Sequence, residues 1–433
     1  MAIDLEKAHR ELWDWCREHN FAGYDPFDAL NSGLFQATPL KYSRAARIAW
    51  TQLFKRSPIN LRSPALVPAG KNSKGTALFA LAALADFRRL RTKDAEANAR
   101  GLLDELLQER LESKSGAACW GYNFDWQGRA FFAPRGTPTI VPTAFAARAL
   151  VEAASVFAEE SYLKIARSVC DFILRDLNRS DEANDTICFS YSPLDRTRIF
   201  NASLLAAETL AATGALTGEK ELGDLAMRAA RYAVDHQSAD GSWTYGEDDY
   251  QSWADNFHTA FILTSLSRII RLWASNSEED DIQPEFTAET KRTQLTHREF
   301  LAAAEGALRL GYEFWRERFF LAHGWPKYYA DRLYPADAHA AGAAISTLVD
   351  LHWLDPGTRD LAARVARWTI ENLRDGCGFF YYQRRRFYTL RTPYMRWSEG
   401  WMMYGLSRLL EGKRKKEKKE NPIHDKRHKR TYV

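Results

Sequence analysis

Acidic and histidine side chains stand just before, or within the first turn of, several stretches that have helical periodicity. Asp255 and His258 are three residues apart, so they would share one side of a helix start. There the histidine could act as a base near neutral pH, and the aspartate could orient it or serve as the acid. A structural interpretation stays open, because Asp255 could cap the helix and His258 could be a buried, hydrogen-bonded side chain. The candidate catalytic residues are Asp125, Asp255, His258, Asp337, His339 and Glu399.

Arginine, asparagine and tryptophan side chains stand near the same points of the chain. Arginine makes forked contacts with carboxylates and phosphates, and tryptophan faces stack on the apolar faces of sugar rings. Two carboxyl groups would suit glycoside hydrolysis. A histidine base near arginine and asparagine would suit removal of a proton beside a uronate carboxylate, in elimination or epimerisation. The residue types leave these three reactions open. The candidate substrate-binding residues are Arg129, Arg135, Asn201, Asn256, Arg396, Trp120, Trp253 and Trp397.

Apolar residues recur with a period of 3.6 along the whole chain, which predicts an all-α fold with short extended turns. Turns of small residues follow every second helix, and most of them carry an aromatic residue with a tyrosine two positions later. We interpret these aromatic pairs as wedges between repeats rather than as ligand platforms. The longest spacing between the turns holds an acidic segment, 275–289, in which we expect little helix. The aromatic residues of the turns are Trp120, Phe189, Trp243, Trp325 and Phe379.

Repeated helix pairs bury their apolar faces only by stacking or by closing into a ring. Six pairs predict a single (α/α)6 toroid over residues 1–411, with an open superhelical solenoid as the alternative. The predicted inner helices, poor in Lys and Glu, are 73–91, 140–157, 200–213, 255–273, 336–352 and 394–411. The predicted outer helices, each with a charged face, are 94–112, 159–178, 218–236, 297–317, 357–374 and the N-terminal helix 3–19, and a further helix is expected at 42–56.

A toroid would bring the starts of the inner helices to one mouth, so the candidate residues should converge there, with Trp120, Trp253 and Trp397 on the walls. More than half of all residues should be helical. The side chains expected in the core are Phe79, Leu81, Phe145, Leu150, Leu204, Leu210, Phe261, Leu266, Leu348 and Leu406.

Charge is distributed unevenly over the 433 residues, which include 60 Lys+Arg and 56 Asp+Glu. Residues 411–433 contain ten Lys/Arg and four acids, so the rest of the chain is nearly neutral and lacks the excess of basic residues expected of a nucleic-acid-binding domain. Residues 412–433 are predicted to form a disordered basic tail that adds nothing to the core. A weak contact of this tail with an anionic membrane surface or with nucleic acid is the alternative.

Several chemistries lack their sequence signatures. The five cysteines are widely spaced without a CxxC pair, which argues against a disulfide framework and against a Cys-rich zinc site. The chain has no H-E-x-x-H, P-loop or GxGxxG motif, so we expect no metal and no cofactor. No apolar run approaches the length of a membrane span, and the first residues do not resemble a signal peptide. These features predict a cytoplasmic protein, peripheral to the inner membrane at most.

Two parts of the sequence resemble known families. Gln237, Gly241 and Trp243 match the Q-x-x-x-G-x-W pattern of terpenoid cyclases and related toroids, but the acidic D-x-D-D and D-D-x-x-D motifs of cyclase chemistry are missing. Four segments resemble a bacterial polysaccharide-biosynthesis family encoded among exopolysaccharide and O-antigen genes: WGYNFDWQGRAFFAPRGTPTIVPTAFAARAL (120–150), CFSYSPLD with FNASLLAA (188–207), DGSWTYGE (240–247) and DNFHTAFIL (255–263). More distantly, the pattern resembles glycoside hydrolases, polysaccharide lyases and sugar epimerases built from six helical hairpins.

These resemblances imply a carbohydrate-active protein that makes or remodels a bacterial surface polysaccharide and takes a glycan or its sugar precursor as substrate. A non-catalytic glycan-binding or scaffold subunit of the same machinery is the alternative. A terpenoid-processing toroid is disfavoured by the missing acidic motifs.

Overall fold

The computed structural model describes residues 4–128, 131–182, 185–280 and 288–420. Helices account for 62% of the chain, as predicted. The inner helices are α4 (Ser73–Leu90), α6 (Ile140–Phe157), α8 (Phe200–Thr217), α10 (Asn256–Asp280), α12 (Ala338–Asp350) and α14 (Gly400–Glu420). The outer helices are α5 (Lys93–Gln108), α7 (Glu160–Arg175), α9 (Lys220–Asp235), α11 (Ala288–Phe319), α13 (Thr358–Leu373) and α1 (Leu5–Glu18).

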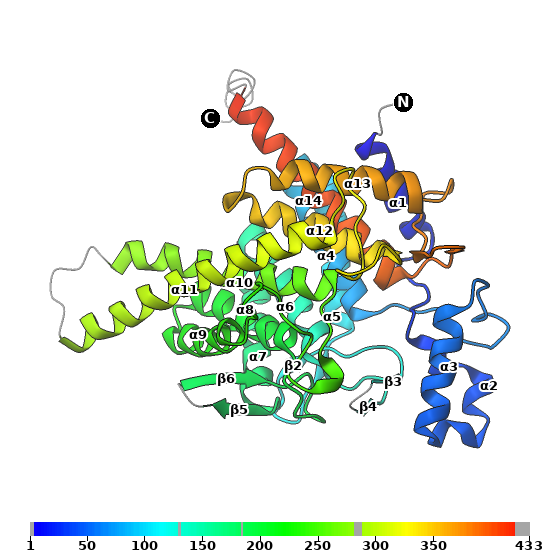
Figure 1. The fold of residues 1–433 in the computed structure, drawn as a ribbon, viewed down its shortest axis with the longest axis horizontal. Helices are drawn as coiled ribbons and strands as arrows, with labels where there is room; N and C mark the ends of the chain where they lie inside the picture. Colours follow the sequence, from blue (N-terminus) through cyan, green and yellow to red (C-terminus); the bar gives the residue numbers. More distant parts are fainter. Residues whose placement is uncertain (1–3, 129–130, 183–184, 281–287, 421–433) are drawn as a thin grey trace.

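The inner helices close into a ring, which excludes the open solenoid. Each packs against the next in chain order, and α14 packs back against α4. Each also packs against one outer helix, and the sixth pair joins α14 to α1, the first helix of the chain (Figure 1). The protein is therefore an (α/α)6 toroid, with the division into inner and outer helices that the sequence predicts.

Composition explains which helices lie inside. In α4, every residue from Ser73 to Asp86 is buried, and the ten core side chains predicted from sequence are all buried. Outer helices such as α7 and α9 bury only one face. Two inner helices touch at glycines: a Cβ on Gly342 of α12 would lie 2.5 Å from the Trp401 backbone of α14. The small residues of the inner helices thus let six helices meet around one axis.

Short hairpins connect outer helices to the next inner helices, and a three-stranded sheet of order β7-β8-β9 joins two of these connections. In the matched Q-x-x-x-G-x-W motif, Gln237 donates to the Ala307 carbonyl of α11 (2.9 Å), and the Trp243 indole donates to the Ala233 carbonyl of α9 (2.7 Å). This motif therefore ties a turn to two outer helices. The strands are β1 (Leu111–Glu112), β2 (Ala118–Cys119), β3 (Trp126–Gln127), β4 (Phe132–Ala133), β5 (Arg179–Glu182), β6 (Thr186–Phe189), β7 (Ala336–Asp337), β8 (Gln383–Arg384) and β9 (Thr389–Leu390).

Residues 20–67 form an N-terminal arm at one side of the helical bundle (Figure 1). Its helix α3 coincides closely with the helix predicted at 42–56. Short helical turns also occur in other connections. The arm contains η1 (Asp28–Asn31), α2 (Gly33–Gln36), η2 (Pro39–Tyr42) and α3 (Arg44–Arg56), and the other turns are η4 (Asp249–Gln251), η5 (Leu351–Trp353) and the π-helical η6 (Met395–Glu399).

Two predicted boundaries are wrong. Little helix was expected in the acidic segment 275–289, but its described residues are helical, because α10 extends to Asp280 and α11 begins at Ala288. The predicted disordered tail begins too early, because α14 continues to Glu420; its Lys- and Glu-rich end has good helix propensity. Residues 421–433 lie outside the described part of the chain.

One helix within the described residues, α6, is long and apolar enough to cross a membrane, with a mean hydropathy of 1.5. It is 67% buried as an inner helix of the toroid, and core helices of this kind share the composition of membrane spans.

Candidate functional site

Tyrosines of the connecting turns surround the starts of the inner helices, at the end of the toroid that we call the N-terminal mouth. The N–H of Ile140 donates to the Tyr191 carbonyl (2.9 Å), and the N–H of Asn256 donates to the Tyr328 carbonyl (3.0 Å). The Tyr122 and Tyr191 hydroxyls are 3.0 Å apart. Burial raises the pKa of both phenols, so each hydroxyl keeps its proton near neutral pH. The mouth thus has an aromatic rim with neutral hydroxyl groups.

Asp255 caps α10 and holds the His258 ring at the same time. Its Oδ1 accepts from the His258 backbone N–H (3.0 Å), and its Oδ2 lies 2.7 Å from His258 Nδ1. The Trp253 indole also donates to Oδ2 (3.1 Å). Asp255 is 1% exposed, whereas the His258 side chain is 19% exposed. A proton on Nδ1 leaves Nε2 as the basic nitrogen of an imidazole that reaches the opening.

His339 of α12 contacts the same phenyl ring as His258. Both ring nitrogens of His339 are buried and have no hydrogen-bond partner among the described residues. The Phe257 ring lies 4.0 Å from the His258 ring and 4.4 Å from the His339 ring, so the two imidazoles meet the same phenyl group. Burial, aided by the nearby Lys74, lowers the pKa of His339 well below its usual value. His339 is therefore neutral and has one free donor and one free acceptor.

Asp337 positions α12 and a tryptophan. Its Oδ1 accepts from the backbone N–H groups of His339 (2.9 Å) and Ala340 (3.2 Å), and its Oδ2 accepts from the Gln383 amide (2.6 Å). The Trp397 indole also donates to Oδ1 (3.3 Å). Burial raises the pKa of Asp337 to about 6, against the opposing effect of these donors. Its oxygens are occupied by protein groups, so Asp337 acts here mainly as a helix cap.

Aromatic side chains from three inner helices form a floor across the toroid. The ring centre of Trp401 of α14 lies 5.1 Å from that of Phe261 of α10 and 5.4 Å from that of Phe145 of α6. The Lys74 ammonium of α4 lies 4.8–5.3 Å from the centres of these three rings. Arg148, further along α6, has its guanidinium 4.8 Å from the Phe145 ring. The floor thus separates the N-terminal mouth from the opposite, C-terminal mouth.

The N-terminal arm supplies further charges to the N-terminal mouth. Arg396 forms a forked, buried ion pair with Asp25 of the arm (2.5 and 2.8 Å). The Lys55 ammonium of α3 lies 4.2 Å from the Phe27 ring centre and 5.7 Å from that of Trp397. Burial lowers the pKa of Lys55 to about 8, although Asp337 and Asp25 oppose the shift. The arm therefore borders the site and contributes a cation to it.

Three predicted site residues have structural tasks instead. Glu399 accepts a hydrogen bond from the Phe380 backbone N–H (2.8 Å). The Trp120 backbone N–H donates to the Thr143 hydroxyl (2.9 Å). Trp120 is fully buried, with its indole donating to a carbonyl of α5, so it is no wall of the mouth. Asn256 donates to the Lys327 carbonyl and accepts from the Trp315 indole, which ties it to α11 and to the connection that follows α11. Glu399, Trp120 and Asn256 are therefore removed from the candidate site.

The remaining predicted residues lie away from the two histidines or lack a defined role. Asp125 accepts from the Arg135 backbone (2.8 Å) and the Gln36 amide (3.4 Å), so it ties a hairpin to the arm, and the Arg135 side chain is exposed. Asn201, at the start of α8, is buried, and its Oδ1 has no hydrogen-bond partner within the described chain. Arg129 lies outside the described residues. The structure thus groups Asp255, His258, Asp337, His339, Trp253, Trp397 and Arg396, and leaves Asp125 and Arg135 at the rim.

Several residues of the mouth were missed from the sequence. In the aromatic pairs, the first residue is a core wedge, as Trp120 and Trp243 show, but the tyrosine two positions later lies at the mouth. The two-residue spacing was the available signal. Lys74 stands alone in an Ala-rich helix start, and such a buried position for lysine follows only from ring closure. Lys55 and Asp25 lie in an arm that the repeat does not predict.

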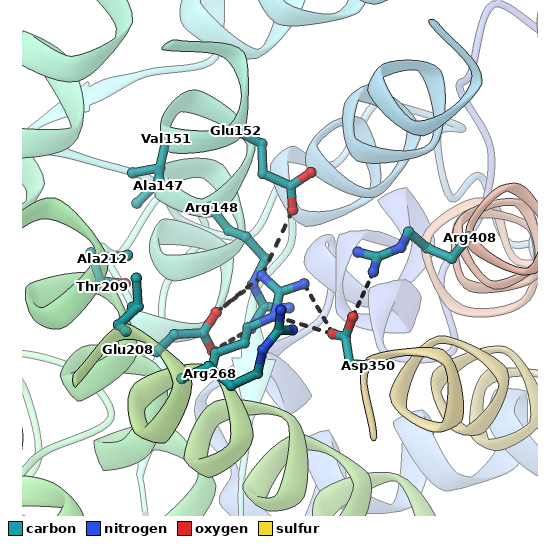
Figure 2. Close-up of a pocket in the computed structure, with 12 residues that line it drawn as sticks. Ala147, Arg148, Val151, Glu152, Glu208, Thr209, Ala212, Arg268, Asp350 and Arg408 are labelled. Atoms are coloured by element: carbon teal, nitrogen blue, oxygen red, sulfur yellow. Dashed lines mark hydrogen bonds and ion pairs between the residues drawn. The ribbon is translucent and has the colours of Figure 1, made fainter. Parts of the chain in front are cut away.

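The C-terminal mouth contains a polar cavity of about 380 Å³ (Figure 2). Arg148 and Glu208 form a forked pair (2.8 and 2.5 Å). Arg268 bonds to Asp350 (3.1 Å) and Glu208 (3.4 Å), and Arg408 bonds to Asp350 (2.6 Å). Burial alone would raise the pKa of Asp350, but Arg408 and Arg268 reverse the effect and lower it strongly. These mutually paired charges join α6, α8, α10, α12 and α14 at this end.

Among the described residues, no group of three or more His, Cys, Asp and Glu side chains could hold a metal ion.

No known protein family matches the sequence, and comparison with curated proteins finds no relative. Solved structures share its fold. A GH76 α-mannanase from Bacteroides thetaiotaomicron aligns with a TM-score of 0.55 at 14% identity, over 80% of this chain and 88% of that one. Cellobiose 2-epimerase from Bacillus thermoamylovorans aligns with a TM-score of 0.56 at 12% identity, over 79% of this chain and 88% of that one. D-mannose isomerase aligns with a TM-score of 0.54 at 13% identity, over 78% of this chain and 86% of that one.

At these identities the likeness shows the (α/α)6 fold alone. The predicted resemblance to glycoside hydrolases and sugar epimerases with six helical hairpins is confirmed at that level. The resemblance to an exopolysaccharide-biosynthesis family has no counterpart in these comparisons.

Proposed function

We propose that the protein is a sugar-modifying enzyme that moves a proton at a carbon beside a carbonyl group, as in epimerisation or isomerisation. One observation carries this proposal: His258, held by Asp255 at 2.7 Å, and the neutral His339, unpartnered among the described residues, meet the same phenyl ring from neighbouring inner helices. A base and an acid on two sides of one carbon are what such a reaction needs. The activities of the epimerase and isomerase neighbours support it.

In this reaction, His258 Nε2 takes the proton from the carbon beside the carbonyl of an open-chain sugar. The electron pair moves to the carbonyl oxygen and gives an enediolate. His339 relays a solvent proton to the other side of the carbon, one ring nitrogen giving up its proton as the other takes one from water, and the epimer forms. His258 then releases the abstracted proton to solvent, so both imidazoles return to their neutral state. Asp255 holds His258 in the tautomer with its basic nitrogen toward the mouth and stabilises the imidazolium that forms. Aromatic rings around the mouth suit the apolar faces of a sugar.

Glycoside hydrolysis is the second candidate, because burial raises the pKa of Asp337 to about 6, near that of a general acid. Its occupied oxygens count against it, as does the removal of Glu399 from the site. The charged and imidazole groups of the mouth also disfavour a terpenoid substrate.

The cellular role that we propose is the making or remodelling of a bacterial surface polysaccharide, in the cytoplasm and on a glycan or its sugar precursor. Support for this role comes only from the sequence resemblance of residues 120–150, 188–207, 240–247 and 255–263.

The test is incubation of the purified protein with reducing mono- and disaccharides in D₂O, with products followed by NMR and mass spectrometry. We expect one deuterium in each molecule of product and an epimer or keto isomer of the substrate. His258→Asn should abolish both, whereas His323→Asn, at an exposed loop position, should not. Shorter sugars without deuterium would establish hydrolysis instead, and binding without any product would establish a glycan-binding subunit.

A further inference from the structure

We propose that the N-terminal mouth takes a sugar that carries a compact anionic group, a carboxylate or a phosphate, and that Lys74 and Lys55 receive this group. This inference rests on the proposed function and names the class of its substrate. It starts from two cations at the mouth that have no carboxylate partner among the described residues.

Lys74 is a buried cation without a counterion in the described part of the chain. Lys74 is 3% exposed, and its ammonium group makes no hydrogen bond or ion pair with the described residues. Its neighbours are instead the rings of Phe145, Phe261 and Trp401, at 4.8, 4.9 and 5.3 Å. Attraction to ring faces compensates only part of the cost of removing an ammonium group from water. A lysine in this position is therefore incomplete without an anion.

The acids of the mouth are already engaged. Asp25 accepts hydrogen bonds from two guanidinium nitrogens of Arg396. Asp255 is bonded to His258 and Trp253. Asp337 accepts from the backbone N–H groups that it caps and from the Gln383 amide. None of these three acids forms an ion pair with Lys74. We therefore infer that the missing anion comes from a ligand.

Further buried donors near Lys74 also lack acceptors among the described residues. The Trp401 indole nitrogen has no hydrogen-bond partner there, although its ring is one of the three around Lys74. Both nitrogens of His339 are also without a partner there, and its ring centre lies 5.1 Å from that of Trp401 and 4.1 Å from that of Trp397. Trp397 in turn carries Lys55 over its ring. Two ammonium groups and an imidazole thus lie around the Trp397 and Trp401 rings, together with the Trp401 indole N–H. All four groups can donate to the oxygens of a carboxylate or phosphate.

Binding of the anion should be linked to proton uptake. Burial lowers the pKa of Lys74 well below its usual value, Arg396 and Arg148 lower it further, and Asp25 opposes them; the neutral His339 also faces this group. An anion beside Lys74 raises that pKa again. Binding of the anion therefore favours the protonated, charged form of Lys74, and any uncharged Lys74 takes up a proton on binding.

The test uses the full chain and calorimetric titration with D-glucuronate, D-glucose 6-phosphate and D-glucose. The two charged sugars separate carboxylate from phosphate, and glucose is the neutral reference. We expect one charged sugar to bind about 10–100-fold more tightly than glucose. Lys74→Met should remove this preference, Lys55→Met should weaken it, and Lys93→Met, at an exposed position on α5, should leave it unchanged. Titration in two buffers of different ionisation enthalpy should show the proton uptake in the wild type and not in Lys74→Met.

A second measurement guards against a variant that fails for structural reasons. Because methionine replaces a buried, unpaired amine with a chain of similar shape, Lys74→Met should melt at the same temperature or about 1–3 °C higher without ligand. Equal binding of the three sugars by the wild type, or an unchanged preference in Lys74→Met, would overturn the inference. Deuterium exchange into a neutral sugar would then leave the proposed function intact. Anion binding that depends on Lys74 without exchange into any sugar would instead reject the proposed function.

Discussion

At the residue scale, acids of similar burial differ in what occupies their oxygens. Asp255 directs one oxygen to the histidine that it orients, whereas Glu399 bonds to one backbone N–H and leaves its other oxygen buried without a partner among the described residues. Burial raises the pKa of Glu399 well above its usual value, against the single opposing hydrogen bond. Glu399 is therefore a structural residue whose protonated form is favoured by burial.

This assignment predicts a stabilising substitution. The unfolded chain loses the Glu399 proton near pH 4.3 and the folded chain only at higher pH, so keeping this proton costs stability at pH 7 and nothing below about pH 4. Glu399→Gln removes that cost and should raise the free energy of unfolding at pH 7 by about 1–3 kcal/mol. The gain should disappear near pH 4 in urea-unfolding curves. Glu371→Gln, at an exposed position, should have no effect; a loss of stability in Glu399→Gln at pH 7 would contradict the assignment.

A second prediction concerns Asp255. Asp255→Asn keeps the size of the side chain, but it removes the negative charge and can donate to His258 Nδ1, which favours the wrong tautomer. The turnover rate in the deuterium assay should fall by about 100-fold or more, with a smaller change in KM. Far-UV circular dichroism should show an unchanged helix content. Wild-type turnover in this variant would exclude His258 as an Asp-assisted base.

At the element scale, the N-terminal arm is held to the mouth by buried charge. The Arg396–Asp25 pair joins segments that are far apart in sequence, and the Arg62–Asp28 pair (2.6 Å) lies within the arm's own core. Removal of one partner leaves the other charge buried and unpaired, which costs about 3–5 kcal/mol. The arm should then detach before the toroid unfolds.

The prediction is that Asp25→Ala makes the arm sensitive to proteases. Limited proteolysis should cut within residues 33–60 much faster than in the wild type, and leave the toroid intact at first. Asp14→Ala breaks an exposed pair with Arg17 and should change neither cleavage nor stability by more than about 0.5 kcal/mol. Equal cleavage rates in Asp25→Ala and the wild type would show that the ion pair does not hold the arm.

The elements also show how far sequence reasoning reaches. Helix periodicity and the aromatic turns were sufficient to predict which helices lie inside and which lie outside, because these patterns are local. The caps Asp255 and Asp337 were recognisable for the same reason. The burial of Lys74 and the contact of Asp25 with Arg396 depend on residues up to 371 positions apart, so no local pattern reports them. The helical start of the tail was missed because charge was weighted above helix propensity.

At the scale of the whole molecule, the aromatic floor divides the toroid into two ends with different electrostatics. Among the described residues, the N-terminal mouth has unpaired donors, and the C-terminal mouth has arginines and acids that satisfy one another (Figure 2). The paired end thus joins the inner helices.

This division predicts an acid-sensitive contribution to stability. Burial would raise the pKa of Glu208, but Arg148 and Arg268 lower it, and the arginines act on Asp350 in the same sense. A lowered folded pKa gives stability that is present above about pH 4 and is lost as the pH falls further. Arg268→Met should therefore cost about 3–5 kcal/mol at pH 7, and less at pH 3.

Thermal or urea unfolding at the two pH values measures this difference. Arg175→Met, which removes an exposed pair with Asp171, is the control and should have little effect. A cost for Arg268→Met that is equal at pH 7 and pH 3 would show that the network does not contribute through its ionised acids.

The central claim is that His258 and His339 share one proton-transfer reaction, and the most direct measurement separates their steps. Recovered substrate and product are analysed for deuterium after incubation in D₂O with each variant. With His258 as the base in the forward direction, His339→Asn should still exchange the substrate proton with solvent but form no product. His258→Asn should give neither exchange nor product. Wild-type product formation by both variants would contradict the claim.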